Sequence, residues 1–207
     1  MKFLKSKIEF PDIKEATSEG IIAVGGDLST DRLLLAYKRG IFPWFEDDNS
    51  ILWWSPDPRF VLYPEELRIS KSMRQVLRNC NFTVTINQAF PEVIKACAEI
   101  KRNGQSGTWI TKNMTESYIE LHKMGFAKSV EVWENDTLVG GFYGLDLGND
   151  VFCGESMFSK VSNASKAAFI TFVQNTNYKV IDCQVHTYHL ESLGGRDIPR
   201  DTYLQYL

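Results

Sequence analysis

The sequence has little cysteine or histidine, and neither is clustered. Its four cysteines, Cys80, Cys97, Cys153 and Cys183, lie far apart without a CxxC pair, and only three histidines occur among 207 residues. A structural zinc site needs a denser set of such ligands, and a disulfide framework is typical of short secreted chains. We therefore expect reduced thiols and no metal site.

Long apolar runs are also absent. No run approaches the roughly 18 residues that cross a bilayer, and the first residues, MKFLKSKIEF, lack the apolar stretch of an export signal. Hydrophobic residues make up 43% and charged residues 24%, as in ordinary globular proteins. We expect a cytoplasmic protein with no membrane partner. A net charge of −3 excludes a uniformly basic surface, but a local basic stripe still permits nucleic-acid binding.

The first sixty residues differ in character from the rest. Five of the seven prolines occur by Pro64, and three of the five tryptophans precede residue 60. One helix is predicted here, beginning near Ser29 and ending at Gly40. The stretch ILWWSPDPRF is too rich in proline for a regular interior element. We expect a small N-terminal domain over residues 1–61 and a larger domain over residues 62–207.

The larger part alternates helices and strands. FTVTIN alternates apolar and polar residues as a half-buried strand does, and Asn87 is predicted to cap the following helix. A turn at 148–150 predicts a hairpin, and Asn163 is predicted to cap an alanine-rich helix that reaches about Gln174. The predicted order is α-β-α-α-β-β-β-α-β. This order predicts an α+β fold with a mixed, largely antiparallel sheet.

An acid and an amide recur in the predicted strand KVIDCQV. The strand period of two places Asp182 and Gln184 on one face and turns Ile181, Cys183 and Val185 to the other. Side chains about 7 Å apart on one face can both reach a single ligand amine. The same pattern also fits a solvent-facing sheet edge.

Two further groups have more than one interpretation. Glu155, in VFCGESMF, is either an outward-facing strand residue or a buried functional acid. Cys183 with His186 or His189 would form a Cys–His nucleophile pair. However, the strand period turns Cys183 away from Asp182, and nothing marks its thiol as activated.

Phenylalanine is abundant in the predicted hairpin and in the helix after it. These residues indicate either core packing or a pocket for a bulky apolar side chain. They are Phe142, Phe152, Phe158, Phe169 and Phe172.

A short helix near residues 70–78 carries three basic residues at spacings of three and four. Lys71, Arg74 and Arg78 therefore lie on one side of that helix. Such a stripe is either an ordinary solvated face or a phosphate-contact surface.

Eight longer segments have unusual sequences and follow one another along nearly the whole chain. They are GGDLSTDRLLLAYKRGIFPWF, WWSPDPRFVL, GTWIT, LVGGFYG, FCGESMFS, NASK, IDCQV and HLESLGG. Strings of this length, in this order, are far more specific than a short glycine motif. Together they resemble one family closely, the bacterial leucyl/phenylalanyl-tRNA–protein transferases.

The resemblance implies a small N-terminal domain packed on a domain of the acetyltransferase superfamily (GNAT-like) fold. It implies a reaction without ATP, metal or another cofactor. Such an enzyme takes leucine or phenylalanine, and more weakly methionine, from its aminoacyl-tRNA. It joins this residue by non-covalent aminolysis to proteins that begin with arginine or lysine, and so marks them for proteolysis by the N-degron route. We expect a monomer.

The resemblance also implies roles for the acids and the amide. The acid matching Asp182 orients the amide matching Gln184, which accepts or relays the proton of the attacking amine. In a second scheme, Asp182 holds the acceptor ammonium and the donor in register. Glu155 matches the acid that holds the basic N-terminal residue of the acceptor.

The remaining substrate contacts follow from the same resemblance. The donor side chain would fill an apolar pocket formed by Phe142, Phe152, Phe172 and Ile181. The terminal adenosine of the tRNA would stack on or lie beside Tyr37, Trp44 and Trp109. Acceptor-stem phosphates would contact Lys71, Arg74 and Arg78.

Two other functions are compatible with parts of this pattern. A conventional acetyl-CoA-dependent N-acetyltransferase needs a (Q/R)xxGx(G/A) loop between a strand and a helix, but the corresponding region reads FSKVSNASKAA. A non-catalytic tRNA-binding module would not need Glu155, Asp182 or Gln184. Mutation of those residues separates it from a transferase.

Overall fold

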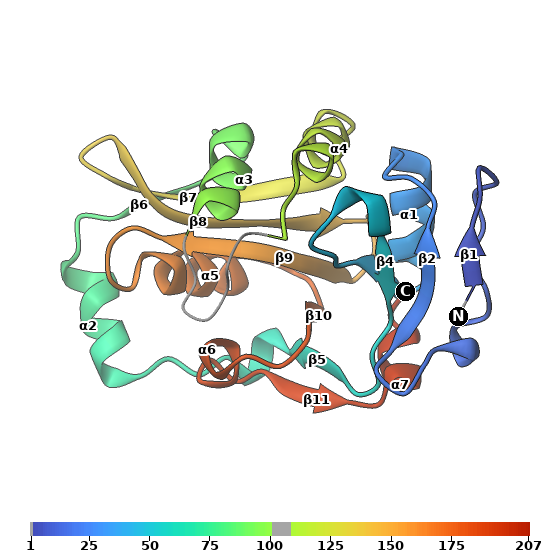
Figure 1. Cartoon of the computed structure of the whole chain (residues 1–207). Helices are drawn as coiled ribbons and strands as arrows, with labels where there is room; N and C mark the ends of the chain where they lie inside the picture. The colour runs from blue at the N-terminus through green and yellow to red at the C-terminus, as the bar shows by residue number, and fades with distance from the viewer. Residues whose placement is uncertain (1, 101–108) are drawn as a thin grey trace.

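The computed structural model describes residues 2–100 and 109–207, and its strands form two sheets (Figure 1). Gly107 and Thr108 of the GTWIT segment lie outside the described residues, whereas Trp109 lies within them. The smaller sheet has the order β1-β2-β4-β3 and is built from the N-terminal region. Its strands are β1 (Lys2–Leu4), β2 (Ile21–Gly25), β3 (Phe42–Pro43) and β4 (Leu52–Trp54).

The predicted N-terminal helix is present as α1 (Thr30–Lys38). Leu33, Ala36 and Tyr37 form its buried stripe. The chain turns after this helix at Gly40, whose φ of 70° lies in the left-handed region that glycine adopts without strain. This turn leads directly into β3.

The larger sheet has the order β11-β5-β10-β9-β8-β7-β6. Among the described residues its pairs are antiparallel except for β9 with β10. The predicted α+β class and the mixed, largely antiparallel sheet are therefore confirmed. The strands are β5 (Arg59–Leu62), β6 (Thr83–Ile86), β7 (Ala127–Glu134), β8 (Thr137–Asp146), β9 (Val151–Ser159), β10 (Val180–Gln184) and β11 (Arg196–Ile198).

Helices cover both faces of the larger sheet. In Figure 1, α3 and α4 lie over one face and α5 lies under the other. None of the helices within the described ranges is long and apolar enough to cross a membrane. The helices that follow α1 are α2 (Lys71–Asn79), α3 (Phe90–Glu99), α4 (Lys112–Lys123), α5 (Ala164–Gln174), α6 (Tyr188–Glu191) and α7 (Arg200–Leu204).

The predicted order of elements is confirmed from α2 through β10. Two predicted caps need correction. Asn87 does not cap α3, because it has a φ of 59° and its side chain accepts a hydrogen bond from the Ser129 amide at 3.0 Å. The cap position of α3 is Ala89. Asn163 does occupy the cap position of α5, but its left-handed backbone leaves its side chain without a capping hydrogen bond.

A buried ion pair links two neighbouring strands of the larger sheet, β5 and β10, and also contacts the N-terminal region. The Arg59 side chain on β5 is 1% exposed and that of Asp182 on β10 is 0% exposed. The guanidinium of Arg59 donates two hydrogen bonds to the carboxylate of Asp182, from Nε to Oδ1 at 2.8 Å and from Nη2 to Oδ2 at 2.6 Å. Its remaining nitrogen donates to the Gly40 carbonyl at 3.2 Å, and the group lies 4.7 Å from the rings of both Phe42 and Tyr203.

We expect Arg59→Met to lower the free energy of unfolding by about 3–5 kcal/mol, because it leaves the Asp182 charge buried without its partner. Urea denaturation measures this loss. Arg196→Met is the matched control, since Arg196 pairs with Glu66 at the surface, where ion pairs contribute about 0–1 kcal/mol. Equal losses for the two variants would contradict a stabilising role specific to the buried pair.

Candidate active site

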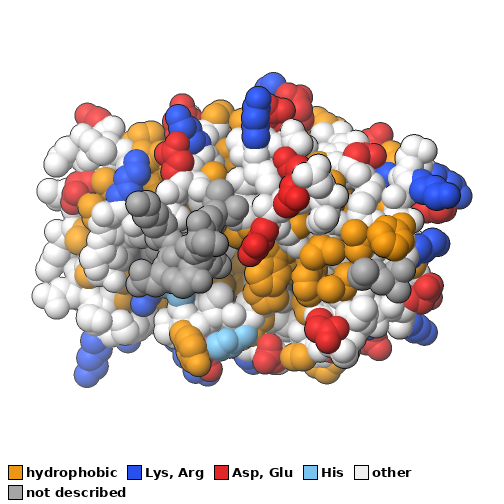
Figure 2. Space-filling view, in the orientation of Figure 1, with side chains coloured by type: hydrophobic (Ala, Val, Ile, Leu, Met, Phe, Trp, Pro, Cys, Tyr) orange, Lys and Arg blue, Asp and Glu red, His pale blue; other side chains and the backbone are white. Residues whose placement is uncertain are grey.

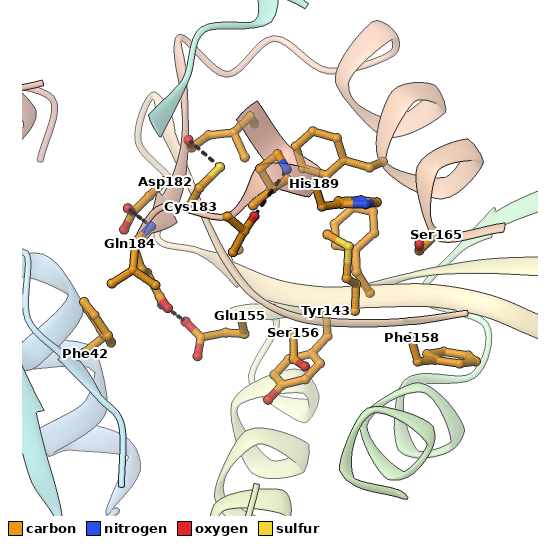
Figure 3. A pocket seen from close by; sticks show the side chains of 18 of the residues that line it. Phe42, Tyr143, Glu155, Ser156, Phe158, Ser165, Asp182, Cys183, Gln184 and His189 are labelled. Carbon is orange, nitrogen blue, oxygen red and sulfur yellow. Dashed lines mark hydrogen bonds between the residues drawn. The ribbon is translucent and has the colours of Figure 1, made fainter. Parts of the chain in front are cut away.

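A cavity of about 520 Å³ opens where β9 and β10 separate. The two strands pair only from Val151 to Cys153 and from Val180 to Asp182, and they diverge beyond those residues. The segment from Phe42 to Trp44 closes one side, and residues of α5 and α6 close the other (Figure 3). An opened parallel pair thus makes a pocket in the middle of the sheet.

Two β-bulges position the polar residues of this cavity. On β9, Gly154 pairs with Gly144 and Ser156 with Tyr143, so Glu155 is an extra residue between them. On β10, Cys183 is the extra residue between Asp182 and Gln184, and Gln184 has a φ of 64°. A bulge turns a side chain away from the regular alternation of a strand. Here the two bulges bring an acid and an amide together.

Glu155 and Gln184 are directly hydrogen-bonded. Nε2 of Gln184 donates to Oε1 of Glu155 at 2.6 Å (Figure 3). The Tyr118 hydroxyl of α4 donates to Oε2 of Glu155 at 3.1 Å, and the Tyr37 hydroxyl of α1 is hydrogen-bonded to that of Tyr118. A continuous polar chain therefore runs from the N-terminal region into the cavity.

Asp182 also lines the cavity, but its carboxylate is bound by other groups of the protein and not by the side chains of the Glu155–Gln184 pair. Its carboxylate accepts hydrogen bonds from Arg59, from the Tyr203 hydroxyl at 2.9 Å and from the backbone amide of Gln184 at 2.9 Å. Both of its oxygens are thus occupied by the protein. Asp182 therefore binds the backbone amide of Gln184, whereas the side chain of Gln184 is hydrogen-bonded to Glu155.

The predicted alternation of β10 holds only up to its bulge. Ile181 and Cys183 pack in the core beneath α5, opposite to Asp182, as predicted. Val185 was predicted on that same face, but it packs against the other core cluster because the extra residue reverses the alternation. The prediction for Val185 is therefore wrong.

Four residues were predicted to form the pocket for the donor side chain. Two of them, Phe142 and Ile181, line the apolar wall of the cavity. Phe152 and Phe172 do not line it. Their ring centroids lie 6.1 Å and 5.3 Å from that of Phe142, so they support Phe142 from behind. Phe158 and Phe169, which the sequence offered as either core or pocket residues, also line it, as do Met157 and Leu190, which the sequence did not single out.

Two tryptophans line the cavity on the side of the N-terminal region. Trp44 is 38% exposed and Trp109 is half-buried. Apolar side chains gather on this face of the molecule over the region of β4 (Figure 2). Tyr37 is almost fully buried and does not line the cavity, but its hydroxyl is hydrogen-bonded to that of Tyr118 and also interacts with the Glu155 carboxylate.

The predicted basic stripe lies apart from the cavity. Lys71, Arg74 and Arg78 are all exposed on α2, and none of them lines the cavity. In Figure 1, α2 is at the end of the molecule opposite to β1. The three cations therefore lie together on α2, as predicted, but they are not part of the cavity.

Cys183 is not an activated nucleophile. Its thiol is buried, which raises its pKa above the ordinary value, and the nearby charge of Asp182 raises it further. Its Sγ atom contacts the carbonyl of Ile181 at 3.6 Å, and His186 is hydrogen-bonded to Glu191. The alternative of a Cys–His pair is not supported by this geometry.

Burial also changes the protonation of Glu155. It raises the pKa of this carboxyl to about 8; the Asp182 charge adds to the increase, whereas hydrogen bonds from Tyr37, Tyr118 and Gln184 oppose it. The pKa values of Tyr37 and Tyr118 are raised by burial and by the Glu155 charge, so both phenols remain protonated donors. Glu155 thus changes charge near neutral pH, in contact with the cavity.

Arg59, Tyr118 and Tyr203 were not assigned to the site from the sequence, and His189 was considered only as a partner of Cys183. Arg59 and His189 lie inside two of the unusual segments, WWSPDPRFVL and HLESLGG, which is the one signal that marks them. Tyr118 lies on a helix whose apolar pattern indicates only core packing. No local pattern distinguishes a buried tyrosine that donates to a catalytic acid from one that fills space.

Curated relatives match the chain over its full length. Proteins named leucyl/phenylalanyl-tRNA–protein transferase from Flavobacterium johnsoniae and Flavobacterium psychrophilum are 58% and 56% identical, and each match covers 100% of this chain and 99% of the relative. One from Pseudomonas syringae pv. syringae is 52% identical over 98% of this chain and 90% of its own. A solved GCN5-related N-acetyltransferase from Kribbella flavida aligns with a TM-score of 0.39 and 10% identity over 78% of this chain and 58% of that one.

Family models give the same result. The model of the leucyl/phenylalanyl-tRNA protein transferase matches residues 61–207, and that of the N-terminal domain of this transferase matches residues 26–57. The chain is therefore an enzyme of the transferase class. It belongs to the leucyl/phenylalanyl-tRNA–protein transferase family.

We expect Glu155→Gln to stabilise the fold above about pH 5. A carboxyl with a raised folded-state pKa keeps its proton in the folded protein while the unfolded chain loses it, so the wild type loses stability from about pH 4.5 to about pH 8. The variant should lack this loss, a difference of roughly 1–3 kcal/mol after allowance for partial solvent contact. Urea unfolding at pH 5, 6.5 and 8 measures it.

The exposed carboxylate Glu116 provides the control for that series. Glu116→Gln changes the same functional group at the surface of α4, where it forms an i,i+4 ion pair with Lys112. Its unfolding free energy should follow that of the wild type across the three pH values. A Glu155→Gln curve parallel to both would show that Glu155 titrates normally.

Proposed function

We propose that this enzyme transfers leucine or phenylalanine, and more weakly methionine, from aminoacyl-tRNA to the N-terminal arginine or lysine of acceptor proteins. The observation that carries the proposal is the Glu155–Gln184 pair, which two bulges place at an apolar cavity lined by tryptophan. In a chain of this family, that arrangement suits a reaction between an aminoacyl ester and an amine.

The apolar wall suits the donor side chain. Phe142, Phe158 and Ile181 offer a surface for a leucine or phenylalanine side chain, supported from behind by Phe152 and Phe172. Such a wall discriminates by only about 1–3 kcal/mol per methylene, so some use of methionine is expected. Trp44 and Trp109 provide faces on which the terminal adenine can stack.

The polar pair suits the acceptor. The cationic side chain of an N-terminal arginine or lysine stabilises the ionised form of Glu155 when it binds, and this attraction is strong because the carboxylate is partly dehydrated. Since Nε2 of Gln184 donates to Glu155, its Oε1 faces the other way and accepts an N–H of the attacking amine. Asp182 positions Gln184 through the backbone, because both of its carboxylate oxygens are already engaged by hydrogen bonds within the protein.

Aminolysis needs no covalent intermediate, because the ester is already activated. The amine nitrogen bonds to the ester carbonyl carbon and the bond from that carbon to the ribose oxygen breaks. The proton that the attacking amine gives up is taken up by this oxygen, so the ribose leaves as an alcohol. An α-amino group has a pKa of roughly 8, so its loss of a proton is easy near neutral pH. The main task of the protein is therefore to position the two reactants.

The remaining assignments complete the proposal. Residues 1–61 form the small N-terminal domain and residues 62–207 the GNAT-like transferase domain, a division supported by the two matched ranges, 26–57 and 61–207. The enzyme acts as a monomer in the cytoplasm, and its products enter the N-degron route of proteolysis.

Transfer of label tests the central claim. The pure protein is incubated with radiolabelled Phe-tRNA or Leu-tRNA and a peptide that begins with arginine, and label should appear in the peptide. A peptide that begins with glutamate is the specificity control. Glu155→Gln should lower kcat/KM for the arginine peptide about 10- to 100-fold, the loss expected for a desolvated charge pair, and should narrow its advantage over the glutamate peptide. No transfer by folded wild-type protein would refute the proposal.

The basic stripe on α2 makes a separate prediction. Lys71→Ala with Arg74→Ala should weaken the binding of all aminoacyl-tRNAs alike and reduce the slope of log K against log salt concentration by about two, because two phosphate contacts are lost. Filter binding at several salt concentrations measures it, with Lys95→Ala/Lys123→Ala on α3 and α4 as the charge-matched control. A changed preference among donor amino acids would contradict the assignment.

A further inference from the structure

A second cavity of about 320 Å³ adjoins the first one at the beginning of α5. Ser159, Ser165 and His189 line both cavities, so the two lie side by side. Lys160 and Lys166 line only the second cavity. The proposed roles of the acids, the amide and the aromatic residues leave this branch of the site unused.

The second cavity is basic. No carboxylate lines it, and no ion pair among the described residues involves Lys160 or Lys166. The positive end of the α5 dipole points the same way, because α5 begins at Ala164. Two cations without carboxylate partners beside a pocket rich in hydroxyl groups favour an anionic ligand.

His189 provides a further, independent indication. Within the described part of the chain, its Nε2 atom is buried and has no hydrogen-bond partner, although a buried polar atom of this kind is normally paired. Burial lowers the pKa of the ring, and the charge of Lys166 lowers it further, so the neutral ring is favoured; its Nε2–H tautomer offers an N–H donor. Figure 3 shows His189 on the side of the cavity where Ser165 begins α5.

We propose that the second cavity binds the phosphodiester that precedes the terminal adenosine of the donor RNA. This inference rests on the proposed function. Three chemically different groups are attached to the terminal ribose of an aminoacyl-tRNA: an adenine base, an aminoacyl ester and a phosphodiester. The site has three matching parts, namely tryptophan faces, an apolar wall and this basic branch. Lys160 and Lys166 neutralise the phosphate, and His189 donates to one of its oxygens.

Two small donors separate this contact from the rest of the tRNA. The phenylalanyl ester of adenosine lacks the phosphodiester, whereas the phenylalanyl ester of cytidylyl-adenosine carries one. Lys160→Gln/Lys166→Gln should raise KM for the dinucleotide ester about tenfold, as expected for the loss of a charge-assisted phosphate contact, with kcat unchanged. Transfer from the adenosine ester should stay at the wild-type level.

Lys95→Gln/Lys123→Gln is the control, since it removes the same charge from exposed positions on α3 and α4. It should leave both donors unaffected. His189→Phe keeps an aromatic ring but removes the Nε2 donor, and it should also raise KM more for the dinucleotide ester than for the adenosine ester. Thermal unfolding of each variant confirms that the fold is retained.

Several outcomes would overturn the inference. An unchanged KM for the dinucleotide ester in the lysine double variant would do so, as would an equal loss with both donors. In another outcome, the wild type binds coenzyme A and the lysine double variant fails to bind it, while transfer from both small esters is unchanged. That result would assign the cavity to a nucleotide cofactor instead. Wild-type protein that uses neither the small esters nor Phe-tRNA would refute the proposed function itself, a result distinct from the other three.

Discussion

The buried ion pair between Arg59 and Asp182 is the interaction on which the rest of the structure depends. It holds β5 against β10, draws the Gly40 carbonyl of the N-terminal region onto the larger sheet, and is enclosed by the rings of Phe42 and Tyr203. A buried pair of this kind contributes less to net stability than its geometry suggests, because both charges lose their water. Its larger effect is on geometry, since the Asp182 carboxylate also receives the backbone amide that turns Gln184 toward Glu155.

The site is built on departures from regular sheet structure. β9 and β10 separate after three paired residues, and each strand carries a bulge at the point of separation. The separation creates space, and the bulges aim Glu155 and Gln184 into it. The same dehydration that raises the pKa of Glu155 strengthens its attraction for a cation. Its charge is thus adjustable near neutral pH, while the phenols of Tyr37 and Tyr118 remain fixed donors.

Sequence patterns predicted the elements that obey a simple period. The helix that follows FTVTIN, which is α3, and the hairpin of β8 and β9 are of this kind. Strands β5 and β11 and helices α6 and α7 are only three to five residues long, too short for a period to show, and they were not predicted. Val185 and Asn87 were misplaced because a bulge and a left-handed residue break the local pattern. Glu155 and Gln184 were both named as candidates from the sequence. The hydrogen bond between their side chains depends on two bulges, which no alternation of apolar and polar residues predicts.

The polar chain from Tyr37 through Tyr118 to Glu155 has a consequence for the modularity of the enzyme. Although two family models divide the chain near residue 60, the first part supplies Phe42 and Trp44 to the cavity wall and Tyr37 to the hydrogen bonds of the acid. The candidate site is therefore composite, and neither part contains all of it. Recombination between relatives at this boundary would exchange half of a shared site, so the two parts are constrained to evolve as one unit.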